Sequence, residues 1–284
     1  MTRSVLTRLL LLLLLTFSMA ALADERGEGP LVPNQPNGIT VDQVIQKFAA
    51  KEKEFKEARE HYTWRQSIEV KTLDGKVEDG KFESKVDILF DDRGRRVEQV
   101  VFAPQSTLQR IDMTREDFED IEKRLPFVLT SDEIPEYDIK YLGQQKEDEL
   151  NTFVFEIRPK HMDPKRRYFE GRIWVDDQDF QIVKTYGKNV PDIVKKKELE
   201  NLFPKFTTWR EQVDGRYWFP TFTKVDDILH FSTGDVHVVQ VVKYTNYKRF
   251  GSQVRITYEG QDLPSTKDPK GPDAGKGSPE QPNP

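Results

Sequence analysis

Residues 152–188 read TFVFEIRPKHMDPKRRYFEGRIWVDDQDFQIVKTYGK, and the pattern of this segment decides the fold. Apolar residues recur at alternate positions over much of three runs, at residues 152–158, 168–176 and 180–187, although some neighbouring positions, such as Val154 and Trp174, are apolar as well. Such alternation is the period of a β-strand that buries one face. Only Asp177-Gln178-Asp179 separates the second run from the third, and Asp favours turns because its side chain hydrogen-bonds turn backbone. The segment therefore predicts antiparallel strands joined by short connections.

The same alternation continues on both sides of this segment. Asp74-Gly75 and Asp214-Gly215 separate further runs, and Asp-Gly between apolar runs is a strong hairpin signal. The further strands that we predict cover residues 62–73, 81–91, 95–102, 139–146, 206–213, 216–226 and 237–250. About ten strands with short antiparallel connections indicate a large twisted sheet that curls into an incomplete, unclosed β-barrel.

Two short helices interrupt this pattern. Thr40 and Gln43 form a capping-box motif at the start of the first helix, which is predicted over residues 40–60. The second helix is predicted over residues 114–124 and ends before Pro126, because proline cannot continue a helix. The fold class that we expect is mainly β, with the two helices as an α lid over the sheet.

The N-terminus has the pattern of a secretory signal peptide. Arg3 and Arg8 precede a leucine run at residues 9–15, and Ala21-Leu22-Ala23 provides small residues two apart at a cleavage site. We therefore predict a signal peptide at residues 1–23 and a periplasmic location after secretion across the inner membrane. The apolar stretch is shorter than the roughly 20 residues that span a bilayer, so no stable transmembrane anchor is expected.

The rest of the chain divides by composition. Residues 24–38 contain Pro30, Pro33 and Pro36 and are expected to form a flexible segment. Residues 259–284 are mostly Pro, Gly, charged and small polar residues, which bury too little apolar area to offset the entropy of ordering. We expect one domain over residues 39–258, followed by a disordered C-terminal tail.

Charge and cysteine content exclude several classes of function. The formal net charge is −5, so the chain lacks the excess of Lys and Arg that attracts nucleic acid, and we expect no nucleic-acid partner. The chain contains no cysteine, which excludes disulfides, thiol catalysis and cysteine metal ligands. Lipidation of an N-terminal cysteine is excluded for the same reason.

Motifs of the common enzyme classes are also absent from the sequence. It holds no G-x-S-x-G, no glycine-rich phosphate loop and no H-E-x-x-H. His230 and His237 flank a turn near Asp235, so a hairpin would bring them together, either as metal ligands or, as we favour, incidentally. We therefore expect no catalytic residue, no metal and no cofactor, and a protein that is not an enzyme.

Aromatic side chains are frequent in the predicted strands. They are explained either as core filling or as the lining of a ligand cavity, because a curved sheet of about ten strands is often too wide for side chains alone to fill. Candidates for the apolar cavity and its helical lid are Val44, Ile45, Phe48, Trp64, Phe90, Phe102, Phe118, Ile121, Phe153, Phe155, Trp174, Phe206, Trp218 and Phe222.

The same strands carry a family resemblance. The matching features are an F-x-F-x-I-x-P-K strand from Phe153, a strand that ends Trp174-Val175-Asp176, and Ile182-Val183-Lys184 after a short turn. The hairpin with Thr208-Trp209-Arg210 and Tyr217-Trp218-Phe219-Pro220 matches as well. In these motifs the chain resembles the periplasmic lipoprotein carriers of the outer-membrane lipoprotein-sorting, or LolA-like, family.

The resemblance implies an incomplete barrel with a helical lid and an apolar interior that carries acylated cargo. The partners that it implies are acyl chains of lipoproteins or lipids, together with transport partners in the inner and outer membranes. Each buried CH₂ of an acyl chain contributes about 0.8 kcal/mol, and lid motion would allow release. We therefore expect a periplasmic carrier or chaperone for outer-membrane sorting. A sensor or regulatory binding protein of the same fold and a secreted hydrolase are the alternatives.

Overall fold

The computed structural model describes residues 29–91, 93–126, 129–195 and 199–250. The predicted signal peptide and the predicted C-terminal tail lie outside the described residues. The helices are α2 (Val41–Arg59), α3 (Arg115–Lys123) and the short 3₁₀ helix η1 (Ile134–Glu136). The strands are β1 (Tyr62–Asp74), β2 (Val77–Phe90), β3 (Arg96–Phe102), β4 (Tyr137–Glu147), β5 (Leu150–Pro159), β6 (Tyr168–Asp176), β7 (Ile182–Val190), β8 (Ile193–Lys195), β9 (Leu199–Asn201), β10 (Phe206–Val213), β11 (Tyr217–Phe231) and β12 (Gly234–Arg249).

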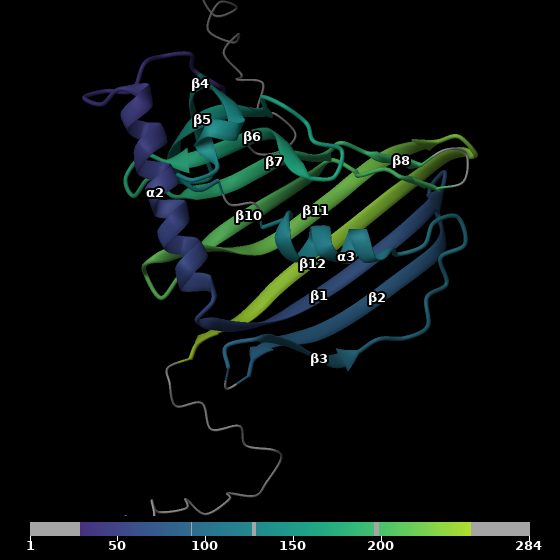
Figure 1. Ribbon diagram of the computed structural model, residues 1–284. Coiled ribbons are helices and arrows are strands. Elements are labelled where there is room, and N and C mark those ends of the chain that lie inside the picture. The colour runs from purple at the N-terminus through teal and green to yellow at the C-terminus, as the bar shows by residue number, and fades with distance from the viewer. Residues whose placement is uncertain (1–28, 92, 127–128, 196–198, 251–284) are drawn as a thin grey trace, which may run out of the picture. The chain divides into compact units, whose positions relative to one another are not determined.

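Ten of these strands form one antiparallel sheet, in the order β3-β2-β1-β12-β11-β10-β7-β6-β5-β4 (Figure 1). The outer strands β3 and β4 do not pair with each other, so the sheet is not closed into a barrel. The predicted fold class, a large curled sheet that forms an incomplete barrel, is confirmed. β8 and β9, which lie between β7 and β10 along the chain, form a separate two-stranded sheet. The sequence does not predict them, because 3 residues are too few for a periodic pattern.

The strand bounds agree closely with the predicted ones. β6 and β10 begin and end at the predicted residues. The predicted strand end at residue 226 is wrong, because β11 continues to Phe231. Both carboxylates at this point have partners. Asp226 lies 2.8 Å from His237 Nε2 on β12, and Asp227 accepts a hydrogen bond from the Lys205 backbone at 2.9 Å.

The two predicted helices are confirmed, and each begins at a capping box. Gln43 N donates to Thr40 Oγ1 at 3.2 Å, and Thr40 N donates to Gln43 Oε1 at 3.0 Å. Thr114 and Asp117 form the same arrangement at the start of α3. Figure 1 shows α2 and α3 on the same side of the sheet. We call the face of the sheet that these helices cover the inner face. No helix in the described part of the chain has the length and apolar character needed to cross a membrane.

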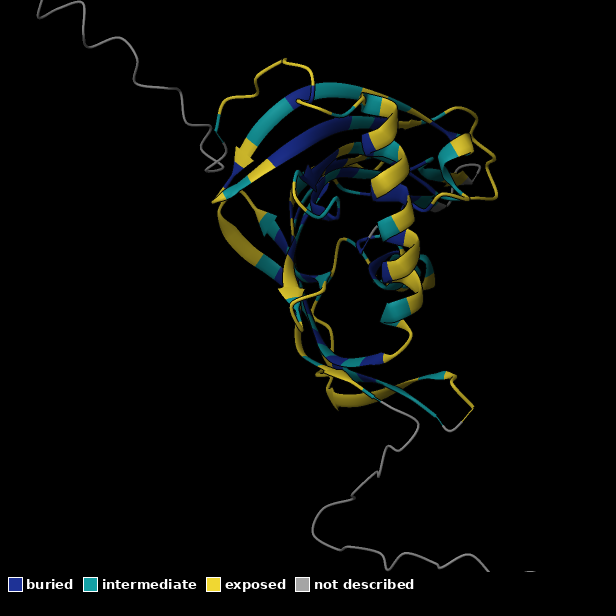
Figure 2. Cartoon of the chain, turned by 90° about the vertical axis from the view of Figure 1, so that its left-hand side faces the viewer, coloured by how far each residue is buried: buried dark blue, intermediate teal, exposed yellow. Residues whose placement is uncertain are grey.

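The main apolar core lies between the helices and the inner face. Val44 and Phe48 of α2 belong to the same buried cluster as Ile121 of α3 and apolar residues of the sheet. On β1 every second residue from Tyr62 to Thr72 is buried, which directs one face of the strand toward the helices. In Figure 2 the outward side of α2 is exposed and the side toward the sheet is buried. The core therefore holds α2 across the sheet.

The chain before α2 runs along the outer edge of β4. Gly29 N donates to Lys146 O at 3.0 Å, Val32 N to Gln144 O at 2.8 Å, and Gln144 N to Val32 O at 2.9 Å. At Gly143, φ is +141°, and a Cβ there would lie 2.2 Å from Val32 O, so only glycine fits. The described part of the segment that we expected to be flexible is thus hydrogen-bonded to the sheet.

Candidate functional site

The inward side of α2 packs against aromatic side chains of the sheet. We call this layer, which includes Phe155 and Phe219, the aromatic floor. Phe48 contacts Phe155 of β5 with ring centroids 5.5 Å apart, and Phe55 makes an edge contact with Phe219 of β11 at 5.1 Å. All four side chains are fully buried. Core filling is therefore the observed role of these rings.

The structure brings most of the predicted cavity and lid residues together in the main core. Its buried members are Val44, Phe48, Trp64, Ile121, Phe153, Phe155 and Phe206, and Ile45 and Phe90 pack against them. Phe118 of α3 is 40% exposed and contacts Phe82, with ring centroids 5.7 Å apart. Phe102, at the end of the outer strand β3, is 45% exposed.

Trp174, Trp218 and Phe222 lie outside the main core. Trp174 belongs to a separate small cluster, against which Trp218 packs. Ile173 and Val175 both belong to the main core, and strand geometry turns the residue between them to the other face, which we call the outer face. The structure therefore does not bring these three aromatic residues together with the others.

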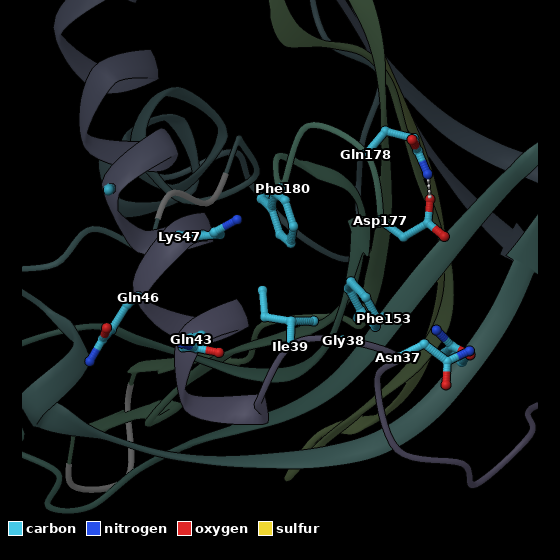
Figure 3. Close-up of a pocket in the computed structure, with 12 residues that line it drawn as sticks. Asn37, Gly38, Ile39, Gln43, Gln46, Lys47, Phe153, Asp177, Gln178 and Phe180 are labelled. Carbon is cyan, nitrogen blue, oxygen red and sulfur yellow. Dashed lines mark hydrogen bonds between the residues drawn. The ribbon is translucent and has the colours of Figure 1, made fainter.

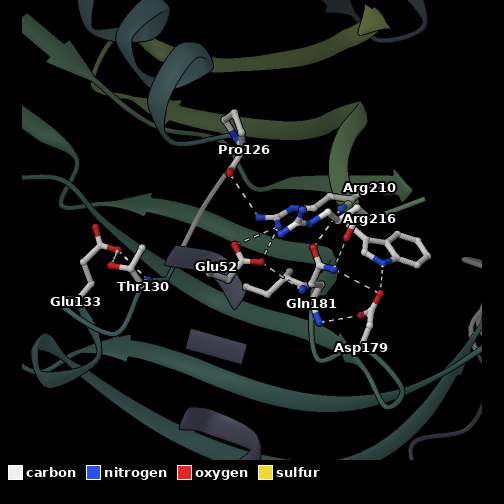
Figure 4. Close-up of polar contacts among 10 residues, drawn as sticks. Glu52, Pro126, Thr130, Glu133, Asp179, Gln181, Arg210 and Arg216 are labelled. Carbon is white, nitrogen blue, oxygen red and sulfur yellow. Dashed lines mark hydrogen bonds and ion pairs between the residues drawn. The ribbon is translucent and has the colours of Figure 1, made fainter. Parts of the chain in front are cut away.

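A buried ion pair fixes the middle of α2 to the sheet (Figure 4). Arg210 Nη1 of β10 donates to both carboxylate oxygens of Glu52, at 2.9 and 3.1 Å, and the two side chains are 1% and 0% exposed. Ile182 N also donates to Glu52, at 3.3 Å, and Arg210 Nη2 lies 3.5 Å from Pro126 O. Burial raises the pKa of Glu52, although Arg210 acts in the opposite direction. A polar link thus lies within the apolar interface.

The prediction from the sequence missed Glu52, Arg59 and Arg210. Glu52 follows Phe48 by four residues and precedes Phe55 by three, and Arg59 follows Phe55 by four. This spacing places Glu52 and Arg59 on the same side of the helix as Phe48 and Phe55, and that is the signal that identifies inward-facing charges. Arg210 carries no comparable local signal, because its partner is distant in the sequence.

Gln181 links two turns beside this ion pair (Figure 4). Gln181 Nε2 donates to Arg216 O at 2.9 Å, and Trp218 N donates to Gln181 Oε1 at 3.3 Å. Trp218 Nε1 donates to Asp179 Oδ2 at 2.7 Å. The indole N–H of Trp218 therefore joins the β6–β7 turn to the start of β11.

A pocket of about 820 Å³ opens at the N-terminal end of α2 (Figure 3). It is lined by Asn37, Gly38, Ile39, Gln43, Gln46, Lys47, Ala50, Gln144, Phe153, Asp177, Gln178 and Phe180. Lys47 Nζ lies 4.2 Å from the centre of the Phe180 ring, and Gln178 donates to Asp177 at 2.7 Å. Phe153 belongs to the main core, so this mostly polar pocket borders the apolar interior.

A second pocket, which we call the basic pocket, opens at the C-terminal end of α2. Its volume is about 600 Å³, and it is lined by Lys56, Arg59, Glu60, Trp64, Phe90, Gly94, Arg96, Glu122, Lys123, Arg124, Glu133 and Tyr137. Trp64 and Tyr137 belong to the main core, and Phe90 packs against it. The apolar interior under α2 is thus bordered by one pocket at each end of the helix.

Each of the two histidines considered as metal ligands pairs with an aspartate instead. His230 Nδ1 lies 2.8 Å from Asp235, and His237 Nε2 lies 2.8 Å from Asp226. The β11–β12 register places His237 opposite Ile228, so the two histidines are not direct cross-strand partners. Among the described residues, no group of three or more His, Cys, Asp or Glu is arranged to hold a metal ion.

Comparison with known proteins finds similarity among solved structures only. No family model matches the chain, and no curated protein matches it. A DUF1329 family protein from Desulfovibrio piger is 13% identical, with 70% of this chain and 90% of that chain covered at a TM-score of 0.35. For a LolA superfamily protein from Nitrosomonas europaea the identity is 15%, the coverage 71% and 94%, and the TM-score 0.32.

A LolA superfamily protein is thus among the structures that this chain resembles. The MucA/MucB complex of Pseudomonas aeruginosa is a further match, at 9% identity, with 71% of this chain and 99% of that chain covered and a TM-score of 0.20. At TM-scores of 0.35 or less, the likeness carries no conclusion about function.

Proposed function

We propose that the mature protein is a periplasmic carrier or chaperone that holds acyl chains of lipoproteins or lipids between α2 and the inner face. One observation carries the proposal. A helix whose inward residues Val44, Phe48 and Phe55 are fully buried covers an aromatic floor on a sheet that is not closed. Outer-membrane sorting, with transport partners in both membranes, is the role that the resemblance of the sequence motifs adds.

An acyl chain that enters beneath α2 exchanges one set of apolar contacts for another. Burial of about a dozen CH₂ groups contributes on the order of 10 kcal/mol. The contacts that Phe48 and Phe55 give up to the floor are replaced by contacts with the chain, so the apolar surfaces are not left in water. Opening with a ligand therefore costs far less than opening without one.

The helices are tied to the sheet by discrete polar contacts. α2 is held by the Glu52–Arg210 pair, and α3 by Asn189, which donates to Asp120 at 2.9 Å. Such contacts can break while the strand pairing stays intact, as the motion of a lid requires. This arrangement supports uptake and release of cargo by movement of the helices.

Native mass spectrometry of residues 24–284 purified from the periplasm, combined with lipid extraction, tests the proposal. We expect fatty-acyl species at about one per chain and uptake of an added fluorescent fatty acid. Transfer of the bound chain to vesicles is expected of a carrier. Protein that is purified without a bound acyl chain and takes up no added fatty acid would contradict the proposal.

A pair of variants locates the binding site. Phe48→Ala alters the interface between α2 and the floor and is expected to change fatty-acid affinity at least fivefold. Trp174→Phe, on the outer face, is the matched control and should leave the affinity unchanged. Thermal unfolding followed by circular dichroism shows whether both variants fold. Equal effects of the two substitutions would place the ligand elsewhere.

A regulatory protein that binds a partner is the second candidate function, and β3 favours it. β3 is an outer strand, and Val97, Val100 and Val101 on it are 43%, 63% and 47% exposed. An edge strand with exposed apolar side chains can accept a strand from another protein. Cargo transfer to vesicles separates the candidates, because a carrier delivers its acyl chain and a sensor does not.

A further inference from the structure

The basic pocket has more positive than negative side chains, although the whole chain has a formal net charge of −5. Its cations are Lys56, Arg59, Arg96, Lys123 and Arg124, and its acids are Glu60, Glu122 and Glu133. The Glu122 carboxylate lies 3.1 Å from Arg96 Nη1, and the Glu133 carboxylate lies 4.0 Å from Lys56 Nζ. Two of the three acids are therefore already engaged by cations other than Arg59.

Arg59 has no carboxylate partner among the residues that the structure describes. Its Nη2 donates to the backbone oxygen of Glu122 at 3.1 Å, and its guanidinium carbon lies 5.2 Å from the ring centre of Trp64. Burial lowers the pKa of Arg59. Tyr247 and Tyr244 act in the opposite direction, and the positive charges of Arg96 and Arg210 act in the same direction as burial. A half-buried guanidinium without a counter-ion is stabilised when an anion reaches it.

Two further donors of this pocket are unused. Trp64 Nε1 and Arg96 Nε are buried and have no hydrogen-bond partner in the part of the chain that the structure describes, and Trp64 as a whole is only 5% exposed. Buried donors without acceptors are rare because they cost free energy. Arg59, Trp64 and Arg96 come from α2, β1 and β3, and the groups that they present here are donors only. An oxyanion is the chemical group that satisfies three such donors at once.

The apolar side of the basic pocket leads toward the floor beneath α2. Trp64 and Tyr137 belong to the main core that α2 covers, and Phe90 packs against this core. A molecule with its anionic end beside Arg59 therefore has its chain next to apolar residues of the main core.

We propose that the basic pocket binds the anionic head group, a carboxylate or a phosphate, of the acyl ligand. Arg59 supplies the ionic contact, and Trp64 Nε1 and Arg96 Nε donate hydrogen bonds to the same group. The inference deepens the proposed function and depends on it. It makes the terminal charge of the ligand, and not its chain alone, a determinant of affinity.

Two matched pairs of ligands test the head-group site on residues 24–284. The first pair is myristic acid and tetradecanol, and the second is myristoyl lysophosphatidic acid and monomyristoylglycerol. Their affinities are measured by displacement of a neutral fluorescent acyl probe. We expect the acidic member of at least one pair to bind at least tenfold more tightly. A preference in the first pair alone assigns a fatty acid, and one in the second alone assigns a phospholipid.

Three variants locate the preference. Arg59→Gln should abolish the preference for the acidic ligand without weakening the binding of the neutral ligands. Trp64→Phe, which keeps a ring but removes the N–H, should reduce the preference two- to fivefold. Arg95→Gln is the control, because Arg95 pairs with Asp91 at 2.7 Å outside the pocket. Trp64→Phe keeps the test decisive if Arg59→Gln does not fold.

The outcomes separate the two proposals. Equal affinity for the acidic and neutral members, or a preference that survives both pocket substitutions, overturns the head-group site and leaves the proposed function standing. Failure of all four ligands to displace the probe, together with failure of the probe itself to bind, overturns the proposed function and the head-group site with it.

Discussion

Substitution of Glu52 by Gln is the most direct perturbation of the contact between α2 and the sheet. Glu52 and Arg210 meet through two hydrogen bonds of 2.9 and 3.1 Å and are 0% and 1% exposed. Gln keeps the size of the side chain and can still accept one hydrogen bond, but it removes the negative charge. Arg210 then stays charged in a position from which water is excluded.

The expected loss of stability follows from this burial. Removal of one partner of a buried ion pair costs about 3–5 kcal/mol, whereas replacement of both partners by apolar residues is often nearly neutral. Because Gln retains a hydrogen bond, we expect Glu52→Gln to lower the free energy of unfolding by about 3 kcal/mol. That is a large part of the roughly 5–15 kcal/mol that stabilises a typical domain.

Urea unfolding followed by circular dichroism measures the effect. Glu54→Gln is the matched control, since Glu54 lies on the exposed side of α2 and its side chain is 46% exposed in a pair with Lys51. The control should change the free energy of unfolding by less than about 0.5 kcal/mol. The double variant Glu52→Leu/Arg210→Met should recover most of the loss. A cost below about 1 kcal/mol for Glu52→Gln would refute the reasoning.

Three further predictions concern single residues. Burial raises the pKa of Asp120 from 3.8 to about 6, so its contribution to stability is present below about pH 4 and is lost as the pH rises through 6. Asp120→Asn should remove this loss and raise the free energy of unfolding at pH 7 by about 1–3 kcal/mol. Urea unfolding at about pH 4 and at pH 7 measures the difference. Gly143→Ala should cost about 1–3 kcal/mol and expose the Val32 amide to hydrogen exchange, because φ is +141° and Val32 O blocks a Cβ. Phe155→Ala, in a fully buried position, should cost about 3–5 kcal/mol in the same unfolding assay, and a loss below 1 kcal/mol would contradict its place in the core.

The strands were predictable because their burial alternates with a period of two. On β1 the buried residues run from Tyr62 to Thr72 at every second position, as the sequence pattern indicates. Ile173-Trp174-Val175 is different, since all three residues are apolar and no alternation tells which of them face the core. A register shift between Trp174 and Val175 adds to this ambiguity. The face of each aromatic side chain therefore needs the three-dimensional structure.

The buried charges of the candidate site were predictable only in part. Helical spacing alone places Glu52 on the inward side of α2, so the sequence does carry that signal. Lys184 carries none, because a lysine in a strand is expected to be exposed, yet its side chain is 2% exposed and lies 3.0 Å from Glu147. Partners of this kind meet through strand pairing between distant segments, which local spacing cannot reveal.

The pairing of β1 with β12 has a consequence for the order in which the chain can fold. Tyr62 lies opposite Arg249 and Leu73 opposite His237, so among the described strands β1, β2 and β3 pair with the rest of the sheet only through β12. Contacts between segments so far apart in sequence form late, because closing the long loop costs entropy before any contact is gained. A chain that emerges from its N-terminus onward therefore cannot complete this sheet until its last strand, β12, is free to pair.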